Sequence, residues 1–371
     1  MRGVCQKELA ALPQRLEPLL PAGADISNTS LVPGGISFVT RLSTACLANL
    51  FLGSPTRILM RVASFKADQF SLLEKKIKAV DWELFLPEHT RLDIKVSTKK
   101  SRLFHSDAIA DRCLPLILDR ISGNQTPKAP YSQTLMIRAD HDRFELSLDM
   151  SGIPLFKRGI KQRVVQAPLR ETLAFAVLKA LDFSRDDILV DPMCGSGTFS
   201  LEGAMIQSAL PPGFFRHFAF EAWPGFGPKG FAHVLSKIKH KIILTDGPSI
   251  FASDIDRTAV ENLNAVAHTH KALERIQAAP QDFFQIIPPK TKRGKGVVVL
   301  NPPYGRRLCK GLDMKLFFKE IGQKLAKDFS GWRAGIILPD RHSAAALNLP
   351  LTPMPIFHGG LDLYAGIGKI P

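Results

Sequence analysis

The sequence predicts an α/β protein in two parts: an α+β region, then a mostly parallel sheet with an antiparallel strand at its C-terminal end. The chain has 371 residues, enough for two or three domains. Strand-like and helix-like segments are mixed up to about residue 150, and from residue 168 apolar strands alternate with helices, which is typical of parallel sheets. Two strand-like segments within 355–370, joined at Gly359-Gly360, close the pattern.

Composition and charge narrow the class of protein. Hydrophobic residues make up 45% of the chain and charged residues 22%, which excludes disordered and collagen-like proteins. No apolar run reaches the ~18 residues that cross a bilayer, and the first residues lack the apolar core of a secretory signal. Five cysteines without metal-ligand spacing favour a cytoplasmic protein with reduced thiols and no metal. The net charge of +15 is spread along the chain and favours a phosphate-rich partner.

The first part, residues 1–152, is expected to be an α+β region. Apolar spacing of three to four residues indicates helices, and alternating or continuous apolar residues indicate strands. The expected helices are 7–20, 42–49, 67–79 and 106–122, and the expected strands are 36–39, 57–62, 91–96, 133–138 and 143–149. The polar turn 139–142 predicts that the last two strands pair antiparallel. Residues 153–167, rich in Lys, Arg and Gln, are expected to be a linker.

The second part, residues 168–371, is expected to carry the parallel sheet. Its expected strands are 188–190, 250–253, 275–278, 297–300 and 335–338. The gap between the first two strands is far longer than the ~20 residues that usually separate a glycine loop from the acid that follows it. The Gly- and aromatic-rich piece 211–230 is therefore expected to be an insertion.

A glycine-rich turn follows the first of these strands. Asp191 comes one residue past the strand, and Gly195 and Gly197 let the backbone approach a ligand because neither carries a Cβ. Open α/β sheets bind ligands at this end of their strands. A plain tight turn is the alternative, but the acid at the strand end favours a cofactor loop. The predicted cofactor contacts are Asp191, Pro192, Cys194, Gly195, Ser196, Gly197 and Thr198.

Acidic residues also follow the next two strands. Asp254 is expected to accept hydrogen bonds from both hydroxyls of a ribose, and Ile255 is a predicted cofactor contact beside it. For Asp256, the alternative role is that of a helix N-cap. Asp282 is a candidate for the amino group of an adenine, and Phe283 for packing against its ring. An N-cap or a turn explains Asp282 equally well.

The tetrapeptide Asn301-Pro302-Pro303-Tyr304 ends the strand 297–300. The prolines stop the strand and leave local carbonyls free to accept, because proline has no N–H. The Asn301 side-chain oxygen and the Pro302 carbonyl are expected to accept both N–H bonds of one exocyclic base amine, while Tyr304 stacks on the base. This aims the nitrogen lone pair at an electrophilic methyl without a strong base. The alternative is a strand-end turn that happens to contain two prolines.

Together these segments resemble the class I S-adenosylmethionine-dependent methyltransferases with an N-P-P-Y motif. Among them, the chain is most similar to the THUMP-domain RNA guanine-N2 methyltransferases, in particular the bacterial 23S rRNA enzymes. The resemblance is carried by 167–174, 191–198, 253–256 and 301–308, and in the first part by 57–62, 80–82 and 147–152.

This resemblance implies a Rossmann-like methyltransferase domain over 168–371, an RNA-binding region over 1–152 with a THUMP-like domain at about 45–152, and S-adenosylmethionine as cofactor. The implied substrate is N2 of a guanine in 23S rRNA or a large-subunit precursor, in the cytoplasm. The tetrapeptide is shared with adenine-N6 and glutamine methyltransferases, so a DNA adenine-N6 methyltransferase is the alternative.

Basic residues are the predicted RNA contacts. Three of them cluster on a β-like segment with few nearby acids, and two follow the tetrapeptide: Lys99, Lys100, Arg102, Arg306 and Arg307. The basic segment 290–295 precedes the strand 297–300, and a phosphate contact and a solvated loop explain it equally well.

Overall fold

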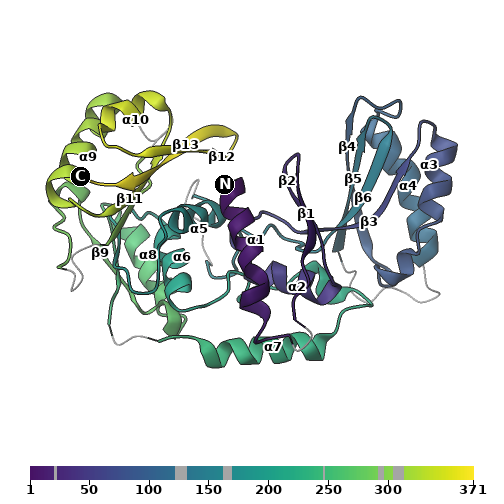
Figure 1. Ribbon diagram of the computed structural model, residues 1–371, viewed down its shortest axis with the longest axis horizontal. Helices are drawn as coiled ribbons and strands as arrows, with labels where there is room; N and C mark the ends of the chain where they lie inside the picture. The colour runs from purple at the N-terminus through teal and green to yellow at the C-terminus, as the bar shows by residue number, and fades with distance from the viewer. Residues whose placement is uncertain (21–22, 122–131, 162–168, 245–246, 291–295, 304–312) are drawn as a thin grey trace.

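The computed structural model describes residues 1–20, 23–121, 132–161, 169–244, 247–290, 296–303 and 313–371. The molecule is elongated, with one sheet at each end (Figure 1). Helix α1 (Arg2–Leu16) and the hairpin of β1 (Ser27–Val32) and β2 (Gly35–Val39) lie between the two sheets, and α7 (Pro228–Lys241) runs beneath them. The sequence did not predict β1, which begins with four polar residues and is mostly exposed.

The C-terminal part holds a seven-stranded sheet among the described residues. Its strand order is β12-β13-β11-β10-β7-β8-β9. The strands are β7 (Leu189–Asp191), β8 (Ile250–Asp254), β9 (Ile276–Pro280), β10 (Val297–Leu300), β11 (Arg333–Leu338), β12 (Thr352–His358) and β13 (Leu361–Lys369). β7 to β11 pair in parallel, and β13 runs antiparallel to both of its neighbours. The predicted fold class is confirmed.

This sheet is buried on both faces. Along β10, Val297 and Val299 join one apolar cluster while Val298 and Leu300 join the other, and none of the four side chains is exposed to solvent. Such continuous apolar runs are typical of parallel strands covered by helices on both sides. The covering helices are α5 (Glu171–Ala180), α6 (Thr198–Gln207), α8 (Arg257–Ala267), α9 (Met314–Asp328) and α10 (Arg341–Leu347).

The N-terminal part holds a four-stranded sheet in the order β3-β6-β5-β4. The strands are β3 (Leu59–Lys66), β4 (Arg91–Lys99), β5 (Ser132–Asp140) and β6 (Arg143–Asp149). β5 and β6 pair antiparallel, as the polar turn predicted, whereas β4 pairs with β5 in parallel. Helices α3 (Phe70–Lys78) and α4 (Ser106–Ile121) cover one face of this sheet, and the opposite face is open (Figure 1). Helix α2 (Leu42–Phe51) packs at its base.

The predicted insertion crosses back onto the N-terminal part. Phe218, Phe220 and Trp223 belong to the same apolar cluster as Leu50 and Phe144 of the N-terminal part, and α7 adds buried apolar side chains to it. The Trp223 indole N–H donates to the Gln133 side chain at 2.8 Å. The insertion is thus longer than its sequence signal, because it includes α7, and the two parts share a core.

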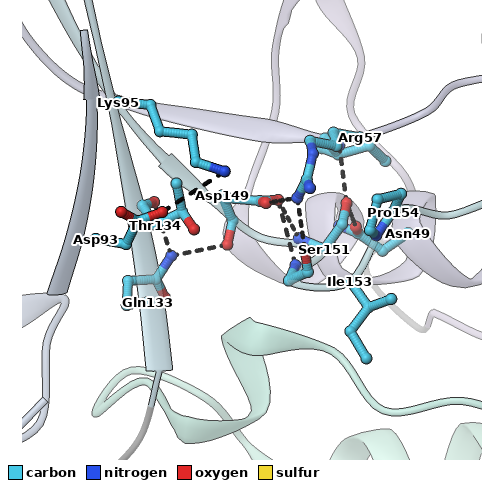
Figure 2. Close-up of polar contacts among 12 residues, drawn as sticks. Asn49, Arg57, Asp93, Lys95, Gln133, Thr134, Asp149, Ser151, Ile153 and Pro154 are labelled. Carbon is cyan, nitrogen blue, oxygen red and sulfur yellow. Dashed lines mark hydrogen bonds and ion pairs between the residues drawn. The ribbon is translucent and has the colours of Figure 1, made fainter. Parts of the chain in front are cut away.

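A buried polar junction holds the base of the four-stranded sheet (Figure 2). The fully buried Asp149 carboxylate accepts hydrogen bonds from Arg57 and from the backbone N–H of Ser151. Burial raises the pKa of Asp149, and the Arg57 charge opposes that rise. The Ser151 hydroxyl donates to Asn49 at 2.7 Å, so α2, β3 and β6 are joined through this junction.

The segment expected to be a linker is packed where it is described. Leu155 is buried, and Arg158 is 4% exposed. Arg158 forms an ion pair with Glu202 of α6 at 2.9 Å and donates to the Gly53 carbonyl at 2.7 Å. Composition suggested a solvated segment, but this basic side chain has a buried carboxylate as partner. Residues 162–167 of the expected linker lie outside the described residues.

Candidate active site

Three neighbouring strands bring the predicted site residues together. β10, β7 and β8 are adjacent and parallel, so their carboxyl ends lie along one edge of the sheet. Asn301, Asp191 and Asp254 stand at these three ends. Open α/β sheets bind ligands at this edge.

Asp191 is a buried carboxyl with one oxygen unused. It is 1% exposed, and its Oδ2 accepts from the backbone N–H of Ser200 at 3.2 Å and from the Ser200 hydroxyl at 2.7 Å. Its Oδ1 is buried and has no hydrogen-bond partner among the described residues. Burial raises the pKa of Asp191 to about 7; the charge of Asp254 adds to the rise, and the Ser200 bonds and Lys161 oppose it.

The glycine loop, residues 192–197, lies against the end of β8. Gly195 and Gly197 have φ angles of 49° and 70°, in the left-handed region that favours glycine. A Cβ on Gly197 would lie 2.3 Å from the Leu263 side chain, whereas one on Gly195 would meet nothing within 4 Å. The backbone N–H of Gly195 donates to Asp254 Oδ2 at 2.8 Å. The loop is therefore packed against Leu263 at Gly197, whereas the space beside Gly195 is open to a ligand.

Pro192 and Cys194 form the buried side of the loop. The Cys194 backbone N–H donates to the carbonyl of Ser253 at 2.9 Å. Burial raises the pKa of the Cys194 thiol well above its ordinary value, so it stays protonated. Their contacts with the cofactor stay a prediction.

The two acids at the end of β8 have different surroundings: Asp256 has the N-cap role that the sequence offered as its alternative, and the ribose contact of Asp254 stays a prediction. Asp256 caps α8, because its carboxylate accepts from the backbone N–H groups of Thr258 and Ala259. Asp254 instead faces the glycine loop and keeps its carboxylate beside the open edge. Ile255 is 77% exposed, so its apolar side chain is available to a ligand at this edge.

At the end of β9, the exposed aromatic ring belongs to the residue after the predicted Phe283. Asp282 accepts a hydrogen bond from the backbone N–H of Phe284 at 3.0 Å, which is the cap that the sequence offered as the alternative role. Phe283 is 2% exposed and packs into the core, whereas Phe284 is 37% exposed. Phe284 therefore has the ring surface that was predicted for Phe283, because the cap turns the first Phe inward.

Asn301 presents an unused acceptor. Its Oδ1 is buried and has no hydrogen-bond partner among the described residues. Leaving a buried polar atom without a partner costs free energy of folding, so such an atom in a predicted site is a candidate contact for a ligand. Pro302 is buried and Pro303 is partly buried, which fixes the turn. Tyr304, Arg306 and Arg307 lie outside the described residues.

Lys161 is a functional candidate that the sequence did not reveal. Its ammonium donates to the Thr198 hydroxyl at 2.7 Å and to the Ser196 hydroxyl at 3.1 Å, both at the glycine loop. Lys161 lies in the segment expected to be a linker, and no pattern separates it from the other basic residues there.

The predicted RNA contacts on β4 are only partly as expected. Lys99 and Lys100 are exposed. Arg102 is not free of acids: it pairs with Asp68 at 2.8 Å, and its backbone N–H donates to Asp142 at 2.6 Å. The sequence hid these acids because they come from other segments. Residues 291–295 of the predicted basic segment lie outside the described residues.

A cleft of about 2130 Å³ separates the two sheets. It is lined by the open face of the four-stranded sheet, the β1–β2 hairpin, the start of α1 and the β12–β13 hairpin. Tyr364 in its lining pairs with Leu338, the last residue of β11, so the cleft reaches the carboxyl edge at β11 and β13, whereas Asn301, Asp191 and Asp254 are not among its described lining residues. Basic side chains outnumber acidic ones in the lining: Arg2, Arg57, Arg61, Lys95, Arg138, Arg143 and Arg170 against Asp140, Glu145 and Asp362.

The described residues contain neither a membrane-spanning helix nor a cluster of metal-ligating side chains. In that part of the chain, helices fall short of the length and apolarity needed to cross a membrane. The same residues contain no group of three or more His, Cys, Asp or Glu side chains placed to hold a metal ion.

The fold and the strand-end site define the chain as a member of a methyltransferase family. Residues 158–350 match the family described as RMKL-like, methyltransferase domain, and the chain belongs to this family. Among its relatives, the ribosomal RNA large subunit methyltransferase K/L of Syntrophotalea carbinolica is 31% identical over 96% of this chain and 52% of its own length. The chain thus spans about half the length of that relative.

Two further comparisons cover most of both chains. The Bacillus subtilis protein named "Putative RNA methyltransferase YpsC" is 33% identical over 78% of this chain and 76% of its own. The crystal structure of SMU.472 complexed with SAH is 25% identical, covers 98% of this chain and 95% of its own, and superimposes with a TM-score of 0.82.

Proposed function

We propose that this protein transfers a methyl group from S-adenosylmethionine to an exocyclic amine of a base in RNA. The observation that carries the proposal is the buried Oδ1 of Asn301, which has no hydrogen-bond partner in the described part of the chain and lies at the carboxyl end of β10, two strands from Asp254. An acceptor in that state suits an amine that arrives with the substrate. The family to which the chain belongs and the RNA methyltransferases named among its relatives support the same reaction.

The residues at the edge fit the proposed cofactor. Asp254 suits the ribose hydroxyls, and the unused Oδ1 of Asp191 suits an ammonium group. The open space above Gly195 lets the cofactor approach the backbone. Ile255 and Phe284 offer exposed apolar surface for the adenine. S-adenosylmethionine supplies a methyl group on a positively charged sulfur.

Asn301 then prepares the amine for attack. Its Oδ1 and the carbonyl of Pro302 accept hydrogen bonds from the two N–H groups of the base amine. This takes the nitrogen lone pair out of conjugation with the ring. No strong base is required, since the proton leaves after the methyl arrives. Tyr304 is proposed to stack on the base, as aromatic side chains do on extruded bases.

We assign the finer points on the same grounds. The substrate is N2 of a guanine in 23S rRNA or its precursor, in the cytoplasm, and the relative named for the large ribosomal subunit supports this choice. Residues 1–152, with a THUMP-like domain at about 45–152, dock the RNA, and residues 168–371 carry the chemistry. The basic cleft leads phosphates toward Asn301, with Lys99 and Lys100 as outer contacts.

Methyl transfer with deuterated S-adenosylmethionine tests the proposal. The substrate is rRNA from cells that lack the gene, and nucleosides are identified by mass spectrometry. The expected product is labelled N2-methylguanosine in 23S rRNA, absent with Asn301→Ala. Asn264→Ala, away from β10, is the matched control. Label in N6-methyladenine of DNA, and none in RNA, would establish the alternative function instead.

A further inference from the structure

Lys161 sits behind the glycine loop and connects it to the segment that leaves the N-terminal part. Its ammonium donates to the hydroxyls of Thr198 and Ser196 and lies 3.4 Å from a carboxylate oxygen of Glu171. The side chain is only 12% exposed. A lysine held this deeply, with three oxygens around its ammonium, is fixed in one orientation.

The donors of Lys161 determine the polarity of the two hydroxyls. An ammonium group only donates, so each hydroxyl oxygen accepts from Lys161 and directs its own O–H elsewhere. Ser196 and Thr198 lie 3.4 Å apart, close enough for one of them to donate to the other. At least one O–H is then left to donate outside this group of three residues.

The acceptor for that O–H is found in the chemistry of the proposed cofactor. Its amino-acid end carries one ammonium and one carboxylate. Asp191, close enough to Lys161 for their charges to interact, holds an unused Oδ1 that suits the ammonium. A hydroxyl whose oxygen already accepts from Lys161 and whose O–H is free to donate suits the neighbouring carboxylate.

We propose that Lys161 is a positioning residue for the cofactor: it fixes the Ser196 and Thr198 hydroxyls as donors to the carboxylate at the cofactor's amino-acid end. The inference rests on the proposed function, since it assumes S-adenosylmethionine in this site. The competing role for Lys161 is purely structural, in which its charge only balances the nearby carboxylates of Glu171 and Glu202. The two roles differ in one respect: only the first couples Lys161 to the hydroxyls during binding.

Titration calorimetry with S-adenosylhomocysteine on the full chain tests this coupling. Lys161→Met is expected to weaken binding about tenfold, the effect of removing one hydrogen bond with a charged partner. Ser196→Ala/Thr198→Val should weaken it at least as much. Adding Lys161→Met to that double variant should then change Kd by less than about twofold. Lys157→Met, an exposed lysine of the same segment, is the matched control and should bind as the wild type does.

The outcomes separate the two proposals. An unchanged Kd for Lys161→Met, or an equal loss with and without the hydroxyls, overturns the positioning role while the proposed function stands. Failure of the wild type to bind S-adenosylhomocysteine overturns both. Should Lys161→Met not fold, the hydroxyl double variant decides, and binding as tight as the wild type overturns the inference.

Steady-state methyl transfer gives a second readout. The hydroxyls would contact the end of the cofactor that does not react, so their binding energy is equal in the ground and transition states. Lys161→Met should therefore raise KM for S-adenosylmethionine about tenfold and leave kcat within about twofold. Lys161→Arg, which keeps the charge, should restore most of KM. A fall in kcat with KM unchanged would contradict the assigned role.

Discussion

The carboxyl of Asp191 has a pKa well above that of an exposed carboxyl. Burial raises its pKa to about 7 from an ordinary value of 3.8, so its protonated form is favoured by folding. The stability that this adds is complete below about pH 4 and is lost as pH rises through about 7. Asn at this position stays neutral throughout.

Asp191→Asn should therefore gain stability relative to the wild type as pH rises. The difference in free energy of unfolding should move in favour of the variant by up to about 4 kcal/mol between pH 4 and pH 8, then level off. Urea denaturation of both proteins without cofactor, across this range, measures it. Asp182→Asn, at an exposed position, is the control. A difference that stays constant with pH would refute the assignment.

Asp254 and Asp256 offer a matched pair of substitutions. Asp254→Ala removes the proposed ribose acceptor and the partner of the Gly195 N–H, and should lower affinity for S-adenosylhomocysteine by about 1–3 kcal/mol. Asp256→Ala removes a helix cap and should lower stability by about 1 kcal/mol with little change in affinity. Calorimetry and denaturation on both variants test this, and unchanged affinity in Asp254→Ala would remove Asp254 from the site.

The sequence correctly located three predicted site residues at the carboxyl ends of strands. Asp191, Asp254 and Asn301 were predictable because an apolar strand fixes where its carboxyl end lies. Phe283 was preferred over Phe284 because a cap turns the chain after a strand, and sequence does not give the direction of that turn. Lys161 was missed because the two hydroxyls it contacts, those of Ser196 and Thr198, are 35 and 37 residues away along the chain.

At the scale of elements, a buried ion pair joins α6 to Arg158, which also donates to the Gly53 carbonyl of the N-terminal part. The side chains of Arg158 and Glu202 are 4% and 1% exposed. Glu202→Ala should lower the free energy of unfolding by about 3–5 kcal/mol, because it leaves the Arg158 charge buried without its partner. The double variant Arg158→Met/Glu202→Leu should be more stable than Glu202→Ala. Urea denaturation compares them, and equal stability of the two variants would contradict this account.

Helices and strands were predictable where their burial requires a regular pattern of apolar residues in the sequence. The central strands β7, β10 and β11 of the seven-stranded sheet are mostly apolar because both faces are covered there, and the wholly buried β10 is the clearest case. β1 carries no such pattern because it is exposed. The parallel pairing of β4 with β5 was not predictable, since it depends on how α4 crosses the sheet between them.

For the whole molecule, the charged cleft predicts how RNA binding responds to salt. If phosphates lie in it, log K should fall with log salt by about 0.7 per phosphate contact for single-stranded RNA. Lys95→Glu/Arg143→Glu, on the open face of the sheet, should reduce that slope by about 0.7 for each phosphate that the protein no longer neutralises. Lys76→Glu, on the helix-covered side, is the control.

Binding assays at several salt concentrations, with rRNA fragments and the full chain, give the slopes. Affinity for S-adenosylhomocysteine should stay unchanged in all three proteins. Equal slopes for the cleft variant and the control would show that RNA lies elsewhere on the surface.

The shared core between insertion and N-terminal part limits how this protein can be taken apart. A cut near residue 152 separates Phe218, Phe220 and Trp223 from the side chains that bury them. The resulting catalytic fragment would expose a hydrophobic aromatic surface to water and self-associate. Gene fusions that exchange the RNA-docking half for another must carry residues 211–241 with it.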